Sequence, residues 1–185
     1  MMSEDSELLF SYARRGDVQS LSALVRRHSV WMQAFLRGML GGTPDADDAF
    51  QNAWMRVIKS AGGYRGGNVK AYLVSAARSA ALDLLRRRGR TVSLDADTED
   101  GVAAAEVPDT APLPGERFES KATAEEMWAA VRTLPEGQRQ VLLMRIEGEM
   151  TFREIADELG IPLGTALTWM RKATERLKRI FGGGR

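Results

Sequence analysis

The residue types in this sequence of 185 residues limit the chemistry that it could perform. It contains no cysteine and a single histidine, His28, which excludes a thiol nucleophile, a cysteine-ligated zinc site and a multi-histidine metal site. Asp47 and Asp48 are not a convincing catalytic pair, because no nearby base, metal ligand or nucleophile accompanies them. We therefore expect no enzyme activity, no metal and no cofactor, and we expect His28 to be buried and hydrogen-bonded.

A second set of residues suits contact with nucleic acid, because aromatic and basic side chains are interleaved between residues 62 and 90. Separated DNA strands expose base faces, which stack on aromatic rings while cations hold the phosphates. Core packing of Tyr72 is at least as good an alternative, and the arginines of residues 86–90 could instead complement a helix dipole. Because four of those five residues are arginines, contact with a polyanion is favoured for them. The candidate residues are Tyr64, Arg65, Lys70, Tyr72, Arg78, Arg86, Arg87 and Arg88.

A third set lies near the C-terminus, where residues 151–179 have the spacing of a helix-turn-helix. A short capped helix and a glycine turn precede a second helix whose polar face could enter a major groove. Hydroxyls and long cations are the groups that reach base edges and phosphates. The alternative is an ordinary helical hairpin with a solvated, charged face. The candidate residues are Arg153, Thr165, Thr168, Trp169, Arg171, Lys172 and Arg176.

A fourth set forms one polar face of a helix predicted over residues 43–59. Its members are Asp47, Asp48, Gln51, Asn52 and Met55. Carboxylates beside amides and one exposed methionine suit the docking of a protein partner. The alternative is a solvated helix face on which the two aspartates complement the positive end of the dipole.

The elements that must position these residues are all predicted to be helices. Apolar residues recur at three- and four-residue steps in both halves of the chain, and no strand pattern competes with them. Several residues are expected to begin or end these helices. Gly16 is expected to end the first helix, and Thr43, followed by Pro44, is expected to cap the start of another. A later helix is expected from about Val69 to Arg87, and capping boxes are expected at Thr123 and Thr151.

Charge divides the chain into three parts. Residues 1–90 carry 14 basic and 8 acidic side chains, residues 91–119 carry 1 and 8, and residues 120–185 carry 11 and 9. The middle part has no helical period and is rich in Asp, Glu, Ala, Pro and Thr, which is typical of a mobile linker. We therefore predict an all-α protein in which a helical bundle (residues 1–90) and a helix-turn-helix domain (residues 120–185) are joined by an acidic flexible linker. Two basic domains around an acidic strip suggest a polyanion partner.

The location of the protein is predicted from the absence of targeting signals. No apolar run reaches the length of a membrane span, and the acidic start Ser3, Glu4, Asp5 is unlike a signal peptide. A chain without cysteine also suits a reducing compartment. We expect a cytoplasmic protein with no membrane contact of its own.

Three segments resemble parts of a known family, the bacterial sigma factors of the extracytoplasmic-function (ECF) group. Asp45-Ala-Asp-Asp-Ala-Phe-Gln-Asn-Ala-Trp-Met-Arg-Val looks like the helix that binds core RNA polymerase. Lys70-Ala-Tyr-Leu, with Leu82-Asp-Leu-Leu-Arg-Arg-Arg after it, resembles the segment that melts the promoter and binds its −10 element. Thr151-Phe-Arg-Glu-Ile-Ala-Asp-Glu-Leu-Gly is similar to the domain that binds the −35 element. The matches keep the family order and span nearly the whole chain apart from the linker.

The resemblance implies a transcription initiation factor that binds core RNA polymerase and directs it to promoters. The docking set on residues 43–59 would contact the clamp helices of the largest polymerase subunit. Residues 62–88 would capture an unstacked base of the non-template strand and hold the melted −10 element, and the C-terminal domain would bind the −35 element as duplex. The acidic linker would thread the positively charged channel of the polymerase. Family members are often held inactive by an anti-sigma factor, so such a partner is expected by resemblance.

The chain departs from the family pattern at four positions. Tyr72 stands where the family usually has Trp, and Ser79 stands where Asn is usual. Leu167 and Trp169 stand near positions where a Lys and an Arg are common. We expect Trp169 to pack on a sugar or a thymine methyl, or to face a protein, and we expect an unusual −35 sequence or weak dependence on it. The alternative function is a stand-alone helix-turn-helix regulator, which would need neither the docking face nor the aromatic and basic segment.

Overall fold

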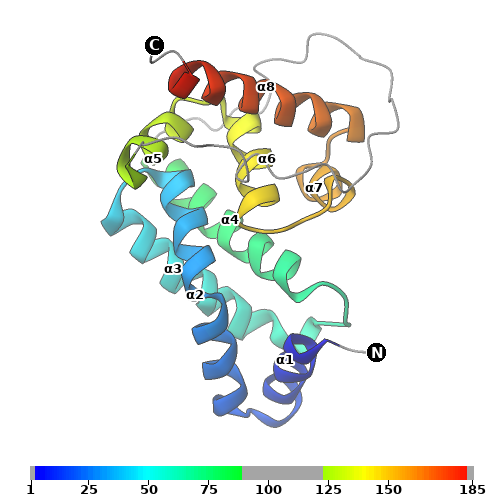
Figure 1. Ribbon diagram of the computed structural model, residues 1–185. Helices are drawn as coiled ribbons and strands as arrows, with labels where there is room; N and C mark the ends of the chain where they lie inside the picture. Colours follow the sequence, from blue (N-terminus) through cyan, green and yellow to red (C-terminus); the bar gives the residue numbers. More distant parts are fainter. Residues whose placement is uncertain (1–2, 89–122, 183–185) are drawn as a thin grey trace. The chain divides into compact units, whose positions relative to one another are not determined.

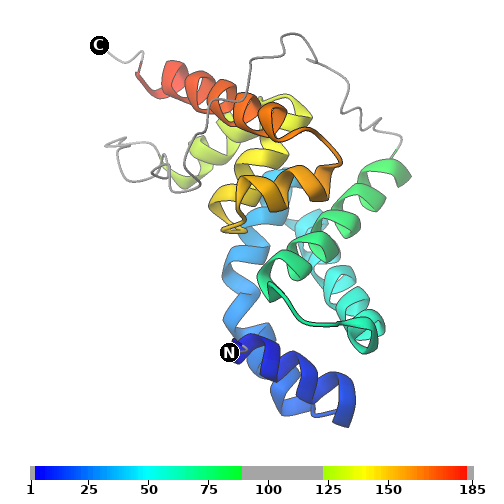
Figure 2. The ribbon, with the colours of Figure 1, turned by 90° about the vertical axis from the view of Figure 1, so that its right-hand side faces the viewer.

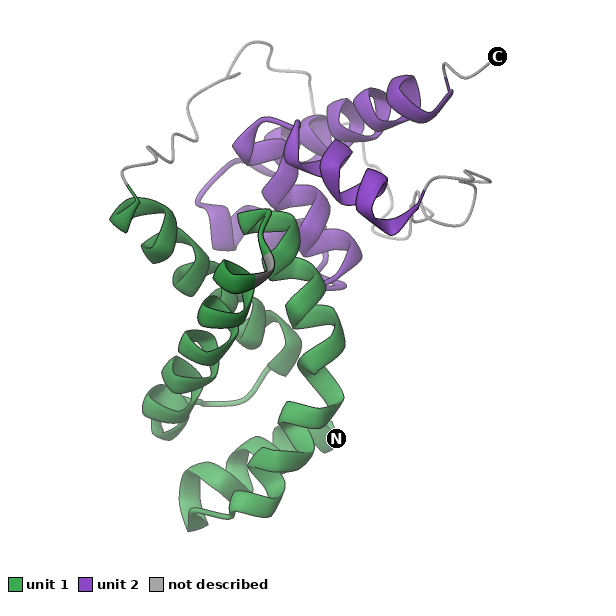
Figure 3. Cartoon of the chain, turned by 90° about the vertical axis from the view of Figure 1, so that its left-hand side faces the viewer, with its two compact units in different colours: residues 1–90 green, residues 91–185 purple. Residues whose placement is uncertain are grey.

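The structure, a computed structural model, describes residues 3–88 and 123–182 (Figure 1). The described residues form eight α-helices and one short 3₁₀ helix and include no strand, so the predicted all-α class is confirmed. The predicted linker, residues 91–119, and the last arginine of the basic run, Arg90, lie outside the described residues. Contacts divide the chain into two compact units, residues 1–90 and residues 91–185, coloured separately in Figure 3.

Unit 1 is a bundle of four α-helices. They are α1 (Glu4–Arg15), α2 (Val18–Leu40), α3 (Thr43–Ser60) and α4 (Val69–Arg87), with the 3₁₀ turn Ala61–Gly63 after α3. The antiparallel pair α3 and α4 packs together most closely, and α2 lies against α1, α3 and α4 (Figure 1). Apolar side chains spaced three and four residues apart fill the space between these helices. The fully buried ones include Leu24, Met32, Phe35, Leu36, Leu73, Val74 and Ala77.

Local capping explains most helix ends of unit 1. Gly16 and Gly41 adopt positive φ angles of 67° and 81° after α1 and α2, the left-handed conformation that favours glycine at a helix end. Gly16 therefore ends the first helix as predicted. The predicted cap Thr43 is wrong by one residue: Gly42 is the N-cap of α3, so Pro44 occupies the second position rather than the first. A glycine can occupy the cap because it adopts the required extended backbone without a side-chain bond.

Unit 2 contains the other four helices. They are α5 (Ala124–Arg132), α6 (Glu136–Ile146), α7 (Phe152–Leu159) and α8 (Leu163–Gly182). Both predicted capping boxes are present, at Thr123 with Glu126 and at Thr151 with Glu154. Gly160, with φ of 67°, ends α7 and begins the turn into α8. Figure 2 shows α8 as the longest helix of this unit, and it packs against α5, α6 and α7. The short helix, glycine turn and long helix have the predicted helix-turn-helix order.

Candidate nucleic-acid interface

The polar face of α3 is open to solvent. Asp47, Asp48, Gln51, Asn52 and Met55 are all exposed, and 49% of Met55 is accessible. Their spacing places them on one side of the helix, whose opposite side buries alanines and a tryptophan in unit 1. Within the described residues, neither of the two aspartates has an ion-pair or hydrogen-bond partner. The face therefore combines negative charge, amides and an exposed thioether that the fold of unit 1 does not use.

The loop between α3 and α4 places its tyrosine inward. Tyr64 is only 7% exposed, and its ring centroid lies 5.1 Å from that of Phe10 and 5.5 Å from that of Tyr72. Its hydroxyl donates to the carbonyl oxygen of Gly67 at 2.8 Å. The expectation that Tyr64 stacks on DNA is contradicted by this burial, because both its ring and its hydroxyl are engaged inside unit 1.

The remaining candidates of this segment are more accessible. Arg65 is exposed, and its Nη1 donates to the carbonyl oxygen of Gly62 at 3.0 Å. Lys70 Nζ lies 5.3 Å from the ring centroid of Trp31, a cation–π distance that keeps the ammonium at the edge of the bundle. Tyr72 and Arg78 are half-buried, and the Tyr72 hydroxyl is hydrogen-bonded to that of Ser60. The Tyr72 ring packs against Tyr64 while part of the side chain stays accessible, so both alternatives for Tyr72 stay open.

The arginines at the end of α4 differ in their partners. Arg86 pairs with Asp83 at 3.3 Å, and Arg88 makes a two-pronged ion pair with Asp45 in the first turn of α3. Arg87 is exposed, and within the described residues it has no ion-pair partner. All three side chains keep substantial exposure, so they remain available to an external anion, although Asp45 already neutralises part of the charge of Arg88.

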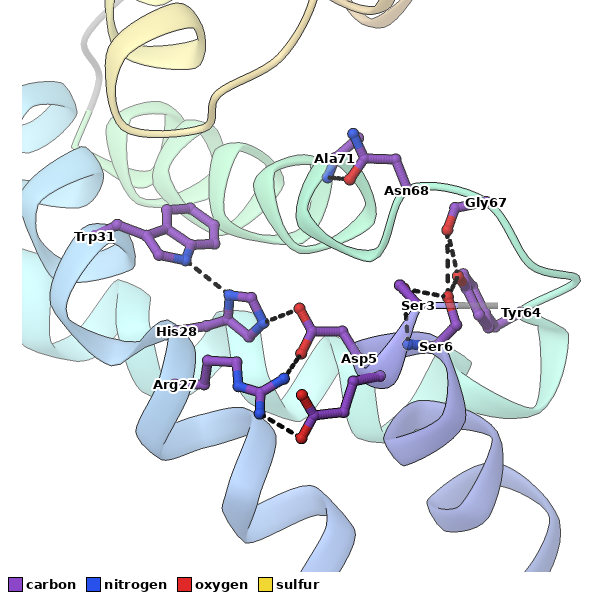
Figure 4. Close-up of polar contacts among 11 residues, drawn as sticks. Ser3, Asp5, Ser6, Arg27, His28, Trp31, Tyr64, Gly67, Asn68 and Ala71 are labelled. Atoms are coloured by element: carbon purple, nitrogen blue, oxygen red, sulfur yellow. Dashed lines mark hydrogen bonds and ion pairs between the residues drawn. The ribbon is translucent and has the colours of Figure 1, made fainter. Parts of the chain in front are cut away.

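The single histidine is buried in a polar network between α1 and α2, as predicted (Figure 4). Trp31 Nε1 donates to His28 Nδ1 at 2.9 Å, and His28 Nε2 lies 3.0 Å from Asp5 Oδ2. Because Nδ1 accepts, the ring proton lies on Nε2 and is donated to the carboxylate. Burial lowers the pKa of His28 below its ordinary value, against the opposing effect of the Asp5 carboxylate. Asp5 is also paired with Arg27, so this network fastens α1 to α2.

The helix-turn-helix presents a stripe of polar groups along α8. Thr165, Thr168, Lys172 and Arg176 are half-buried and follow one another at three- and four-residue steps, while Arg153 on α7 is exposed. Arg171 is exposed and lies 3.6 Å from Glu175, one helical turn away. Hydroxyls and cations on the second helix of such a motif have the types and spacing that major-groove contact requires.

Trp169 does not belong to that stripe. It is 3% exposed, and its indole ring lies against Gly137 of α6, where an added Cβ would come within 2.6 Å of the Trp169 Cη2 atom. The expectation that Trp169 reaches a sugar or a thymine methyl is therefore wrong for this structure. Its position borders the apolar stripe of α8, and the absence of a side chain at Gly137 leaves room for the indole to turn inward.

Comparison with known proteins identifies the family. The family description "Sigma-70 region 2" matches residues 24–91, and "Sigma-70, region 4" matches residues 124–177. The first match includes α3, the loop after it and α4, and the second includes α7 and most of α8. This chain belongs to the sigma-70 family, in its extracytoplasmic-function group.

Curated relatives of this sigma factor are themselves named RNA polymerase sigma factors. The ECF RNA polymerase sigma factor SigE of Mycolicibacterium smegmatis is 30% identical over 160 residues, which are 86% of this chain and 60% of SigE. RNA polymerase sigma factor CarQ of Myxococcus xanthus is 29% identical, over 91% of this chain and 93% of CarQ. The chain thus spans about three fifths of the length of SigE but nearly all of CarQ.

A solved structure shares the fold of this sigma factor. CnrH, in complex with the cytosolic domain of CnrY, has a TM-score of 0.68, with 19% identity over 99% of this chain and 100% of CnrH.

Two buried residues were not among the sequence-based candidates. Ser6 of α1 contacts the Tyr64 hydroxyl and the Gly67 carbonyl, and Gly137 of α6 leaves room for the Trp169 indole. Ser6 could have been found, because it precedes Leu9 and Ala13 on the inward stripe of α1. Gly137 had no such local signal.

Two further findings bear on sites other than nucleic acid. In residues 3–88 and 123–182, no group of three or more His, Asp or Glu side chains could hold a metal ion. None of the helices in these ranges is both long and apolar enough to pass through a bilayer.

Proposed function

We propose that this sigma factor joins core RNA polymerase, directs it to promoters and adds no catalysis of its own. Unit 1 would dock on the polymerase and melt the −10 element, and unit 2 would bind the −35 element as duplex. The observation that carries the proposal is the exposed face of α3, whose aspartates have no partner within the described residues although α3 is otherwise packed in unit 1. Acting with polymerase, the protein would work in the cytoplasm.

Docking on the clamp of the largest polymerase subunit is assigned to Asp47, Asp48, Gln51, Asn52 and Met55. An interface commonly combines a central apolar anchor with a rim of polar and charged groups. Met55 supplies the anchor, and the carboxylates supply a negative rim that a basic partner surface would complement.

Capture of the melted strand is assigned to the loop after α3 and to α4. Extruding a base costs a few kcal/mol, which stacking and pocket contacts must offset. Arg65, Lys70, Arg78 and Arg87 offer cations at or near the surface, and Tyr72 offers a partly accessible ring. Tyr64 takes no direct part in this assignment because it is buried.

Binding of the −35 element is assigned to the polar stripe of α8 with Arg153 and Arg171. Leu167 and the buried Trp169 leave this stripe two cations short of the pattern that the family commonly has. Each cation that neutralises a phosphate adds to affinity and to its salt dependence. Weak dependence on the −35 element therefore remains our expectation for this sigma factor.

A stand-alone helix-turn-helix regulator is the alternative function. Such a regulator would bind duplex DNA without polymerase and would need no docking face on α3. Membership of the sigma-70 family favours the polymerase subunit over the regulator.

A protein inhibitor is a further expected partner. CnrH, which shares the fold, was solved in complex with the cytosolic domain of CnrY. We propose that this sigma factor is likewise bound by an anti-sigma factor, which would hide the surfaces for polymerase and DNA. Co-purification of a tightly bound protein that is released when core polymerase binds would support this partner. A sigma factor that never co-purifies with such a protein would contradict it.

The docking proposal is tested by reversing charge on α3. Asp47→Lys and Asp48→Lys are expected to weaken binding to sigma-free core polymerase at least tenfold, because like charges juxtaposed across an interface cost several kcal/mol. Both side chains are exposed, so thermal unfolding should not change. Binding is measured by fluorescence anisotropy of the labelled full-length protein against core enzyme.

Glu125→Lys is the matched control, because Glu125 is an exposed carboxylate in the first turn of α5 in unit 2. It should bind core enzyme as the wild type does. If Asp47→Lys and Asp48→Lys bound core enzyme as tightly as Glu125→Lys and the wild type, the proposed docking face would be overturned. Transcripts initiated on a genomic library by the reconstituted holoenzyme would then identify promoters, and a holoenzyme that starts none would overturn the function itself.

A further inference from the structure

A hydroxyl cluster joins the first helix to the loop that precedes α4 (Figure 4). Ser6 of α1 is 3% exposed, and its Oγ lies 3.1 Å from the hydroxyl of Tyr64 and 3.4 Å from the carbonyl oxygen of Gly67. Ser3 Oγ, at the N-cap of α1, lies 2.9 Å from Ser6 Oγ. These contacts connect residues about sixty positions apart in the chain.

The loop needs such an anchor because its own backbone is unusual. Gly66 and Gly67 follow each other with φ angles of 103° and 108°, a region that other residues rarely adopt. The Gly67 carbonyl accepts from the Tyr64 hydroxyl at 2.8 Å and also from Ser6. Side chains from two elements therefore hold the carbonyl at the bend, where no helix or strand ladder fixes the chain.

A cavity lies beside this anchored bend. It has a volume of about 520 Å³ and is lined by Ser3, Asp5 and Ser6 of α1 together with residues 66–70. One wall of the cavity is thus built by α1 and the other by the loop and the start of α4, and the hydroxyl cluster joins the two walls.

We propose that Ser6 and Tyr64 are positioning residues for strand capture: by holding Gly67, they set the shape in which the loop receives an unstacked base. The proposal rests on the −10 function proposed above and deepens it, since it assigns base selectivity partly to a helix outside the loop. Tyr64 is not among the residues that line the cavity, whereas Ser6 belongs to its α1 wall. Their effect passes through the Gly67 carbonyl, because moving that carbonyl moves the backbone of residues 66–68 that lines the cavity.

The test uses holoenzyme made from core polymerase and the full chain. A pool of single-stranded oligonucleotides of random sequence is selected on it, and the enrichment of each base at each position is read by sequencing. Tyr64→Phe removes only the hydroxyl and keeps the ring between Phe10 and Tyr72. It is expected to reduce the preference for the favoured base at one position about two- to tenfold, the range of one net hydrogen bond.

Ser6→Ala is expected to reduce the same preference at the same position. The double variant should lose little more than the larger single loss, because both hydroxyls act on one carbonyl. Preferences at the other positions and affinity for core polymerase should not change. A role in stability alone would lower binding of all sequences equally and leave the preference intact.

Ser20→Ala is the matched control. Ser20 is also a buried serine of unit 1, at 8% exposure, and its hydroxyl donates to Asp17 at 2.6 Å, on α2 and away from the loop. It should keep the wild-type preference even if it lowers the unfolding temperature. If Ser6→Ala does not fold, Tyr64→Phe alone decides the result.

The outcomes separate this proposal from the function on which it rests. A wild-type holoenzyme that enriches no sequence would overturn the −10 function. A wild type that enriches a motif, with Tyr64→Phe enriching it to the same degree or losing affinity for all sequences alike, would overturn the positioning role only.

Discussion

Gly137 and Trp169 constrain each other inside unit 2, at the scale of single residues. A Cβ at position 137 would lie 2.6 Å from Trp169 Cη2 and closer still to Cζ3, and both residues are buried. Gly137→Ala is therefore expected to destabilise the protein by about 1–3 kcal/mol, the usual cost of overpacking a core. Urea unfolding followed by tryptophan fluorescence measures the change.

Two further variants make this prediction specific. Gly182→Ala adds a methyl group at a helical position with nothing within 4 Å, so it should leave stability nearly unchanged. Trp169→Leu combined with Gly137→Ala should recover part of the loss, because the smaller side chain makes room. A Gly137→Ala protein as stable as the wild type would contradict the packing.

His28 makes the stability of unit 1 depend on pH. Its pKa in the folded protein is lowered from the ordinary 6.5, chiefly by burial, so the unfolded chain binds the proton more readily. The stabilising effect is present above pH 6.5 and is lost as the pH falls below it. The free energy of unfolding should therefore decrease as the pH is lowered from about 7.5 to about 5.5.

The histidine prediction has a simple control, because His28 is the only histidine in the sequence. His28→Gln should show a clearly smaller change in unfolding free energy over the same pH interval. An equal pH dependence in both proteins would show that His28 is not the group responsible.

At the scale of elements, the capping box of α7 holds the start of the helix-turn-helix. Thr151 Oγ1 accepts from the Glu154 backbone at 3.2 Å, and Glu154 Oε2 accepts from the Thr151 backbone at 2.8 Å. Thr151→Ala is expected to cost about 0.5–2 kcal/mol of stability. Thr151→Ser keeps the hydroxyl and should retain most of it, as thermal unfolding of the two variants would reveal. An equal loss in both would point to the lost methyl group instead.

Helix ends were predictable from sequence wherever the signal was local. Gly16, Thr123, Thr151 and Gly160 act through bonds to residues three or four positions away, so their neighbours in the chain suffice. The cap before α3 was missed by one residue, because Gly42 also adopts the extended conformation that a cap needs.

Side-chain direction was harder to predict than helix position. Tyr64 and Trp169 were both expected on the DNA-facing surface, and both are buried. Tyr64 lies in a loop, to which no helical wheel applies, and a wheel for α8 gives the angle of Trp169 but not the space on the neighbouring helix. Tyr64 turns inward to a hydrogen-bonding partner on α1, Ser6, and Trp169 turns into the space that Gly137 leaves on α6. Both partners therefore lie on other elements than the residues that they orient.

At the scale of the whole molecule, the distribution of charge predicts how strongly the free protein binds DNA. Residues 91–119 carry 8 acidic and 1 basic side chain between two basic parts of the chain. Replacing the eight acids by their amides should raise the affinity of the free protein for random duplex DNA and steepen its salt dependence. Anisotropy titrations at several salt concentrations measure both, and unchanged affinity would remove the idea that the strip screens the protein from DNA.

The ion pair between Asp45 and Arg88 fixes where the described part of unit 1 ends. It joins the end of α4 to the start of α3, next to Asp47 and Asp48, whereas the glycine-rich bend lies at the opposite end of this antiparallel pair. With 18 residues in α3 and a rise of about 1.5 Å per residue, the two tips are separated by about 27 Å. If polymerase binds the proposed docking face, residue 88 would lie at the end of unit 1 that contacts the enzyme, and a force applied there would act on that face before it reached the loop proposed to hold the strand.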